Sequence, residues 1–551
     1  MIPEQLFKFD NLANFVGIFV IVFTLLIALY SIGFMKKTKG LIKYYFYILL
    51  TLIASLGVVF SNNLLLLMVF WGFLGLLLYL LIDFGEKENT TYTAKKAFII
   101  IGGTDALMLL GLALILKITG SLKMDAMSIT LNTKAAVWAY LCLAAGAFAK
   151  AGAMPFHTWV PDTAEDAPTP VTAFLPASLD KLLGIYFLAR ISLYMFRMDT
   201  GMNIFLMTVG SFTIVAAVMM ALVQHDLKRL LGYHAVSQVG YMVLGIGTGN
   251  PVGIAGGIFH MLNHAIYKAC LFLSGGAVEK KANTTDMEKL GGLAKIMPVT
   301  FITFLIASFA ISGVPPFNGF VSKWMIYQGI IDLGKNGSML WIIWLVCAMF
   351  GSALTLASFM KLVHAVFLGQ KAQSPQPTAQ SKGAETSITM LIPMVILAAL
   401  CVIFGVFANR VPLKLFILPS VGKIVEFSGV WNASIATMLI IAGIMVGFII
   451  YLLGTITKTR ETEAFVGGEL LKEYPEMRVS GVDFYKTIQD IGILSFIYKL
   501  AAKKVFDIYE MGASATFAFN GVLRYLHNGI LPTYMAWCLF GMLILFYFLL
   551  R

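Results

Sequence analysis

Long apolar runs separated by short polar segments fill most of the chain. A helix needs about 20 apolar residues to cross a hydrocarbon core about 30 Å thick. By that measure the pattern predicts about fourteen spans, near residues 14–35, 44–61, 63–84, 98–117, 136–154, 170–192, 203–224, 230–247, 252–276, 297–332 (interrupted), 338–366, 386–408, 433–455 and 532–550. We therefore expect an all-α, polytopic membrane protein.

The pattern changes after residue 456. Residues 457–484 are polar and are expected in the cytoplasm, and residues 370–385 have the composition of a loop. Residues 485–526 mix apolar positions with Lys and Arg and contain few helix breakers. This last segment is too polar to span a bilayer and too apolar for a free linker. The pattern favours an amphipathic helix that lies along the membrane or along partner helices.

The composition excludes a soluble protein of several domains. Of the 551 residues, 59% are hydrophobic and 12% are charged, against about 25% charged residues in soluble proteins. The net charge of +12 does not indicate nucleic-acid binding, because no basic stretch is interleaved with aromatic residues outside the hydrophobic spans. With the N-terminus outside, the inside loops hold thirteen basic residues and the outside loops six. This asymmetry places the N-terminus outside the cell membrane.

The cysteines and glycine patterns give no support for a cofactor. All five cysteines lie within apolar segments and form no C-x-x-C pair, which argues against zinc, iron–sulfur clusters and disulfides. No G-x-G-x-x-G or P-loop pattern lies between a strand and a helix. We expect neither a metal nor a redox cofactor in this chain.

One internal repeat interrupts the hydrophobic pattern. Residues 152–157 (GAMPFH) resemble residues 313–318 (GVPPFN), 161 positions later. Both segments put Gly and Pro inside a hydrophobic span, and each has a lysine nearby, Lys150 or Lys323. Paired interruptions of this kind indicate a transporter built from repeated halves with broken helices.

Several ionisable residues fall inside the predicted spans, where they are costly and therefore usually functional or paired. They are Asp105, Lys150, Asp180, Lys181, His234, His260, His264, Lys268, Lys323, Lys361 and His364. Lys150 and Lys323 lie beside the helix breaks, where water can satisfy the freed backbone groups and a lysine could load and release a proton. Lys181 follows Asp180 directly, so a buried ion pair is the alternative to a functional role there.

Two histidines and a lysine recur every four residues along one predicted helix. His260, His264 and Lys268 would form a stripe on one side of it, which is a plausible proton relay. Core histidines bonded to hydroxyls or carbonyls are the alternative. A metal site is disfavoured because no carboxylate accompanies the histidines on that helix.

Four segments together resemble a known family. Residues 149–190, 225–242, 259–276 and 313–329 are similar to the antiporter-like subunits of the complex I superfamily. That group includes membrane subunits of NADH:quinone oxidoreductase, of energy-converting membrane-bound NiFe hydrogenases and of Mrp-type cation/proton antiporters. The resemblance implies two inverted five-helix repeats with broken helices. The amphipathic stretch and final span resemble the lateral helix of the distal subunit.

The resemblance also implies a division of the chain. The expected parts of the chain are N-terminal helices (1–60), a first inverted repeat (61–195), a second inverted repeat (196–370), additional transmembrane helices (371–456), a cytoplasmic linker with the lateral amphipathic helix (457–526) and a final transmembrane helix (527–551).

The family's proton-path residues match positions of this chain. By resemblance, the lysine of the first broken helix is Lys150, the bridging lysine is Lys181, and the second broken-helix lysine is Lys323. The His–His–Lys run falls on His260, His264 and Lys268, and the aspartate of the helix before the break on Asp105. The family usually has a Trp-Glu pair where this chain has Trp71-Gly72, so the glutamate that would pair with Lys150 is missing. We expect Asp105 to replace it, with Asp180 as the second candidate.

The implied function is proton or sodium translocation by a redox-driven complex of the complex I or membrane-bound hydrogenase type. The chain would be a subunit without redox chemistry of its own. Its partners would be other membrane subunits and, through them, a peripheral redox arm. A subunit of a Mrp-type antiporter is the alternative, and a membrane scaffold that has lost pumping is a third.

Overall fold

Helices dominate the part of the chain that the computed structural model describes, which is residues 6–335, 337–369, 385–422, 425–427, 433–453 and 481–550. Two short strands, β1 (Ile129–Thr130) and β2 (Phe196–Arg197), pair in parallel. The expected all-α fold is confirmed. The predicted loop and most of the predicted polar segment, residues 370–384 and 457–480, lie outside the described residues.

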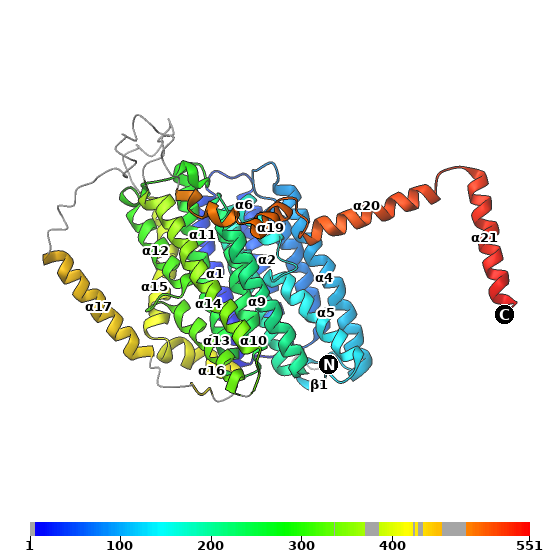
Figure 1. Ribbon diagram of the computed structural model, residues 1–551, viewed down its shortest axis with the longest axis horizontal. Helices are drawn as coiled ribbons and strands as arrows, with labels where there is room; N and C mark the ends of the chain where they lie inside the picture. Colours follow the sequence, from blue (N-terminus) through cyan, green and yellow to red (C-terminus); the bar gives the residue numbers. More distant parts are fainter. Residues whose placement is uncertain are drawn as a thin grey trace. The chain divides into compact units, whose positions relative to one another are not determined.

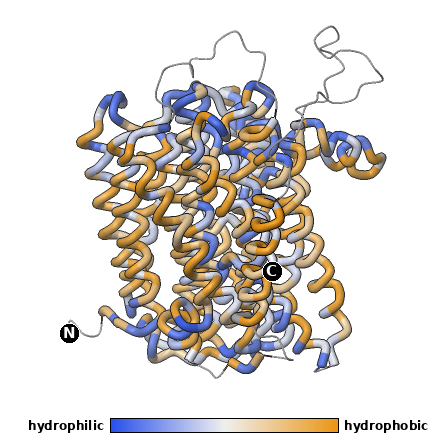
Figure 2. The backbone as a smooth tube through the Cα atoms, turned by 90° about the vertical axis from the view of Figure 1, so that its left-hand side faces the viewer, coloured by the Kyte–Doolittle hydropathy of each residue, from blue (hydrophilic) through white to orange (hydrophobic). Residues whose placement is uncertain are grey.

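Ten helices in the described residues are long and apolar enough to cross a membrane. They are α1 (Asn11–Phe34), α2 (Leu41–Phe60), α3 (Leu64–Ile82), α4 (Thr90–Thr119), α7 to η4 (Thr169–Met195), α9 (Thr200–Leu222), α14 with η7 (Trp341–Leu368), α15 (Ile388–Val406), α17 (Ala433–Leu453) and α21 (Leu531–Leu549). Figure 1 shows α1, α4, α9 and α14 as members of one bundle. In Figure 2 hydrophobic residues cover the helices and hydrophilic residues gather at their ends. The multi-pass membrane architecture is confirmed.

The other four expected spans fall on helices that do not meet this measure of length and hydropathy. They are α5 (Lys134–Ala151), α10 (Leu227–Gly247), α11 (Pro251–Ala282) and the pair α12 (Pro298–Ser312) and α13 (Asn318–Lys335). These helices carry Lys150, His234, the His260–Lys268 stripe and Lys323. The number of fourteen crossings therefore remains a prediction, and each of its four additional members carries at least one of the predicted ionisable site residues.

The centre of the bundle is formed by α11 and by the composite helix α7 (Thr169–Phe174), η3 (Leu175–Leu179), α8 (Asp180–Arg190) and η4 (Ile191–Met195). Every residue of α8 is buried, and burial in α11 is continuous from Val252 to Val278. A helix surrounded by protein on all sides can hold polar side chains that would be too costly against lipid. This is why the polar residues collect on these elements.

The two sequence repeats form the same backbone structure. Helix α5 ends at Gly152 (φ +77°) and α12 ends at Gly313 (φ +80°), both in the left-handed region that favours glycine. The amides of Gly152 and Ala153 bond back to Ala149 and Phe148, and those of Gly313 and Val314 bond to Ala310 and Phe309, each 161 positions later. Each break contains a cis bond before its proline. The predicted broken helices are confirmed.

Shorter elements join these helices. They are η2 (Met124–Ala126), α6 (Trp159–Asp166), η5 (Met287–Lys289), η6 (Leu293–Lys295), η9 (Asn409–Ile417), α16 (Leu418–Val421), η12 (Gly481–Tyr485) and α18 (Lys486–Gln489). Asp or Asn side chains cap several long helices at their starts, among them Asp10 on α1, Asn63 on α3 and Asp226 on α10.

Residues Gly492–Arg551 form a separate unit. It contains α19 (Gly492–Ala502), α20 (Ile508–Leu526) and α21. The expected single lateral helix is wrong in one respect, because α19 and α20 are two helices. Lys504 adopts a positive φ of 58° between them, which stops the first helix, and Asp507 then caps the second by accepting a hydrogen bond from the Tyr509 amide.

Candidate functional site

A buried ion pair lies where α5 meets α8. The Nζ atom of Lys150 is 3.9 Å from Oδ1 of Asp180, and the two side chains are 0% and 3% exposed. The ring of Trp71 on α3 lies under the same ammonium, 5.2 Å from Nζ to the ring centroid. Trp71 also donates its Nε1–H to Oδ1 of Asp105 at 3.0 Å. The four residues form one cluster drawn from α3, α4, α5 and α8.

The expectation that Asp105 pairs directly with Lys150 is wrong. Among the described residues Asp180 forms the ion pair, and Asp105 bonds instead to the indole that separates it from the lysine. Trp71, on α3, contacts both groups: its indole N–H takes the Asp105 carboxylate and its ring lies against the Lys150 ammonium. Beside it, a Cβ atom added at Gly72 would meet nothing within 4 Å. The structure therefore has space for a Cβ atom at position 72, where the family usually has the glutamate.

The lysine of α8, Lys181, projects into the first helix break. Lys181 is fully buried, and its Nζ lies 2.9 Å from the place that a Cβ atom on Gly152 would occupy. The same Nζ is 5.5 Å from the centroid of Trp159, whose Nε1–H donates to the Ala149 carbonyl at 3.0 Å. The break thus makes room for one ammonium, while the indole is a second donor to the Ala149 carbonyl, which also accepts from the Gly152 amide.

The stripe on α11 is fully buried, and its three members differ in their partners. Nδ1 of His260 lies 2.9 Å from Oγ of Ser322, and its Nε2 lies 3.1 Å from Oε1 of Gln238. Lys268 donates to the Leu231 carbonyl at 2.7 Å. In the described part of the chain neither ring nitrogen of His264 has a hydrogen-bond partner. The alternative of ordinary core histidines fits His260 better than it fits His264.

Lys323 turns back over the second break. It is 2% exposed, its Nζ donates to the Ile311 carbonyl at 2.9 Å, and it lies 4.7 Å from the centroid of Tyr241. The 161-residue offset makes Ile311 the counterpart of Lys150, and Asp162 the counterpart of Lys323. The two lysines are therefore not equivalent positions of the repeat, although both ammonium groups lie at a helix break.

His234 belongs to the far side of the same buried row. Its Nε2 lies 2.7 Å from Oγ of Ser358 on α14, and its ring is 4.8 Å from that of Phe359. Phe359 also lies against Lys268, whose Nζ is 5.6 Å from the centroid of the Phe359 ring. The nine predicted site residues thus form two groups. Helices α4, α5 and α8 carry the first group, and α10, α11 and α13 carry the second. The two groups are joined where α8 packs against α11.

Neutral polar residues that the sequence analysis missed complete the row. Gln238, Ser322 and Ser358 are fully buried and bond to the two histidines. Their signal in the sequence is weak, since serine and glutamine occur in many buried helices. The spacing of His234, Gln238 and Tyr241 on one side of α10 could have identified Gln238.

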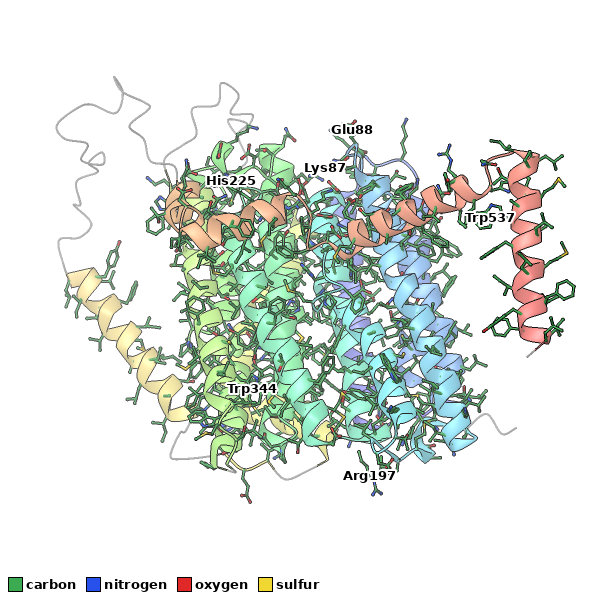
Figure 3. The ribbon with its side chains drawn as sticks, turned by 45° about the vertical axis from the view of Figure 1, so that its right-hand side comes forward. Lys87, Glu88, Arg197, His225, Trp344 and Trp537 are labelled. Carbon is green, nitrogen blue, oxygen red and sulfur yellow. The ribbon has the colours of Figure 1, made fainter. Side chains whose placement is uncertain are left out.

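An ionic cluster occupies one end of the bundle, which we call the charged end. Figure 3 shows Lys87, Glu88 and His225 at this end and Arg197 at the other. Asp162 on α6 contacts Nζ of Lys96 at 2.6 Å and a guanidinium nitrogen of Arg229 at 3.4 Å. Further pairs are Arg229 with Glu165 at 2.6 Å and Lys228 with Glu279 at 3.1 Å. The cluster ties the short helix α6, which carries Trp159, to α4, α10 and α11.

Comparisons with known proteins agree with the sequence resemblance. The family described as "NADH:quinone oxidoreductase/Mrp antiporter, TM" matches residues 61–355. The Na(+)/H(+) antiporter subunit A1 of Staphylococcus epidermidis is 36% identical over 409 residues, which are 70% of this chain and 50% of the relative. The chain spans about half the length of the curated relatives it matches.

Two solved assemblies contain chains with the same fold. The structure of the Mrp complex from Dietzia sp. matches with a TM-score of 0.68 at 23% identity, covering 75% of this chain and 83% of that chain. The structure of the membrane-bound sulfane sulfur reductase, an archaeal respiratory membrane complex, matches with a TM-score of 0.79 at 24% identity, covering 97% and 88%. At these identities the likeness concerns the fold.

Proposed function

The chain belongs to the family of NADH:quinone oxidoreductase and Mrp antiporter membrane subunits, and from this premise we propose that it moves protons or sodium ions across the membrane. The observation that carries the proposal is the row of ionisable side chains in the centre of the bundle. Lys150, Lys181, His264 and Lys268 are fully buried, and Lys323 is 2% exposed. Ionisable groups at such positions are expensive in a membrane protein and mark ion pathways.

The proposed path follows the packing of the helices that carry these residues. It begins at the cluster of Asp105, Lys150 and Asp180, continues to Lys181 in the first break, and crosses to the α11 stripe. From there it reaches Lys323 in the second break and His234 toward α14. Lysine and histidine can each take up and release a proton, and the charge of each acts on the next at short range in a medium of low dielectric constant.

The proposed orientation places the charged end in the cytoplasm and the N-terminus outside. The basic residues assigned to inside loops include Lys87 and Lys96, and both belong to the charged end. Short cytoplasmic loops carry an excess of Lys and Arg, and this excess supports the assignment. The membrane in question would be the cell membrane.

The proposed partners are other membrane subunits and, through them, a peripheral redox arm. Support comes from the respiratory complex whose subunit covers 97% of this chain. A Mrp-type antiporter is the second candidate, favoured by the 36% identity to a Na(+)/H(+) antiporter subunit. In both cases the buried row would move the ions; the redox partner would supply the driving force in the first case and an ion gradient in the second.

The test removes single lysines from the complete complex. Lys150→Ala and Lys323→Ala should leave co-purification of the subunits unchanged and abolish most ion translocation. Translocation is followed as dye-reported acidification of everted membrane vesicles, driven by a respiratory substrate or by an imposed sodium gradient. Lys335→Ala, at a lysine that is 60% exposed, is the matched control. Normal acidification in both buried variants would favour the scaffold reading of this chain.

A further inference from the structure

The segment η12 packs against the last turns of α14 at the charged end. The Tyr485 hydroxyl donates to the Ala357 carbonyl at 2.9 Å. At the other end of the segment, a Cβ atom added at Gly481 would lie 3.1 Å from Cδ2 of His364. Val482 between them is 4% exposed. The segment therefore crosses α14 from Ala357 to His364.

Lys361 lies between these two anchor points, on the same side of α14 as both of them. Its side chain is 5% exposed, and its Nζ donates to the carbonyls of Leu222 at 2.8 Å and Gln224 at 3.2 Å, at the C-terminal end of α9. A cation is favoured at a helix C-terminus. Asp483 is the acidic residue of η12, the segment that crosses α14 at this lysine, and its negative charge favours the ammonium form.

The same turns of α14 touch the buried row. Ser358 bonds to His234, and Phe359 lies against both His234 and Lys268. Lys361 follows these residues by one turn or less and is the next ionisable group toward the charged end. It thus stands between the row and the surface, with η12 across it.

We infer that Lys361 is a further ion-path residue, the station at which a proton enters or leaves the row at the charged end, and that Asp483 is the positioning residue that holds its charge. This inference rests on the proposed function and adds an end point to it. The segment η12 then closes that end, because Tyr485 and Gly481 fix it across the lysine. The chemistry of the site is that of a proton carrier, one amine held by two carbonyls, with a carboxylate in the segment that crosses it.

The decisive variant is Lys361→Arg. Arginine keeps the positive charge and can still donate to the two carbonyls, but it does not release its proton. We expect Lys361→Arg to assemble normally and to lose at least tenfold in vesicle acidification. Normal acidification by an assembled Lys361→Arg complex would overturn the inference. Loss of acidification in Lys150→Ala and Lys323→Ala measured alongside would show that the proposed function still stands.

The role of Asp483 is tested by a double-mutant cycle with Lys361→Gln. Asp483→Asn should lower acidification several-fold in the wild-type background and have no further effect in Lys361→Gln. Asp483→Glu should restore the rate. Asp490→Asn, the same change at an exposed position of the following turn, is the control. Equal losses in both backgrounds, or loss of co-purification in Asp483→Asn, would show that Asp483 does not act through Lys361.

Discussion

Removing the carboxylate of Asp180 should disable Lys150. At the observed 3.9 Å the two charges attract each other by about 4 kcal/mol when the effective dielectric constant is about 20. Breaking a buried pair by removing one partner typically costs about 3–5 kcal/mol, because the remaining charge stays buried without compensation. Since about 1.4 kcal/mol corresponds to a factor of ten, Asp180→Asn should change the occupancy of the charged form of Lys150 by about a thousandfold.

The assay is vesicle acidification by the complete complex, with co-purification of its subunits as the measure of assembly. Asp180→Asn should fall to the level of Lys150→Ala. The control is Asp125→Asn, which removes the partner of Lys123 in an ion pair whose side chains are 42% and 27% exposed, and should have little effect. Near-normal acidification by an assembled Asp180→Asn complex would refute the reasoning. The pair would then be structural, and Asp105 would have to act on Lys150 through Trp71.

Three further predictions concern the surroundings of this pair. Gly72→Glu should fit without steric conflict at its Cβ atom and should partly restore acidification to Asp180→Asn; no recovery would contradict a shared role of the two carboxylates. Gly152→Ala should lose translocation, because its Cβ atom would meet Nζ of Lys181 at 2.9 Å. The control is Gly120→Ala, where φ is also positive but nothing lies within 4 Å of the added Cβ atom. This control should cost only about 1–2 kcal/mol of backbone strain and should leave translocation unchanged. Asp162→Asn should lower the thermal unfolding midpoint of the complex in scanning fluorimetry by weakening contacts of α6 that are each worth about 1.5–3 kcal/mol, and an unchanged midpoint would contradict the anchoring role of Asp162.

The sequence was most informative where one residue type strongly favours one local structure. A glycine followed by proline inside an apolar run predicts a break, and both breaks lie where Gly152 and Gly313 stand, because no other residue adopts that backbone conformation as readily. A lysine inside an apolar run likewise predicts a buried ionisable group, because lysines in membrane spans are costly and usually face the interior of the bundle. These features depend on local chemistry alone.

The pairing of charges between helices could not be predicted in the same way. Whether Lys150 meets Asp105 or Asp180 depends on how α4, α5 and α8 are rotated, and on the indole of Trp71, which bonds to Asp105 and lies against Lys150. Hydropathy does not encode those rotations. The break between α19 and α20 was missed for another reason. Lysine is a good helix former, and its positive φ at position 504 has no signal in the pattern.

The two breaks also solve one structural problem in different ways, and the difference bears on how Lys323 works. An interrupted helix leaves carbonyls that need donors. In the first break the Ala149 carbonyl accepts from both the Gly152 amide and the Trp159 indole, and neither Lys150 nor Lys181 bonds to it. The counterpart of Trp159 after the second break is Phe320, whose ring has no N–H. The Ala310 carbonyl, the counterpart of Ala149, accepts from the Gly313 amide, and Lys323 donates to the next carbonyl along, that of Ile311. A neutral amine still carries two N–H bonds, so Lys323 can give up a proton and continue to cap the helix. The second break therefore needs no separate donor, and one lysine can serve as both cap and proton carrier.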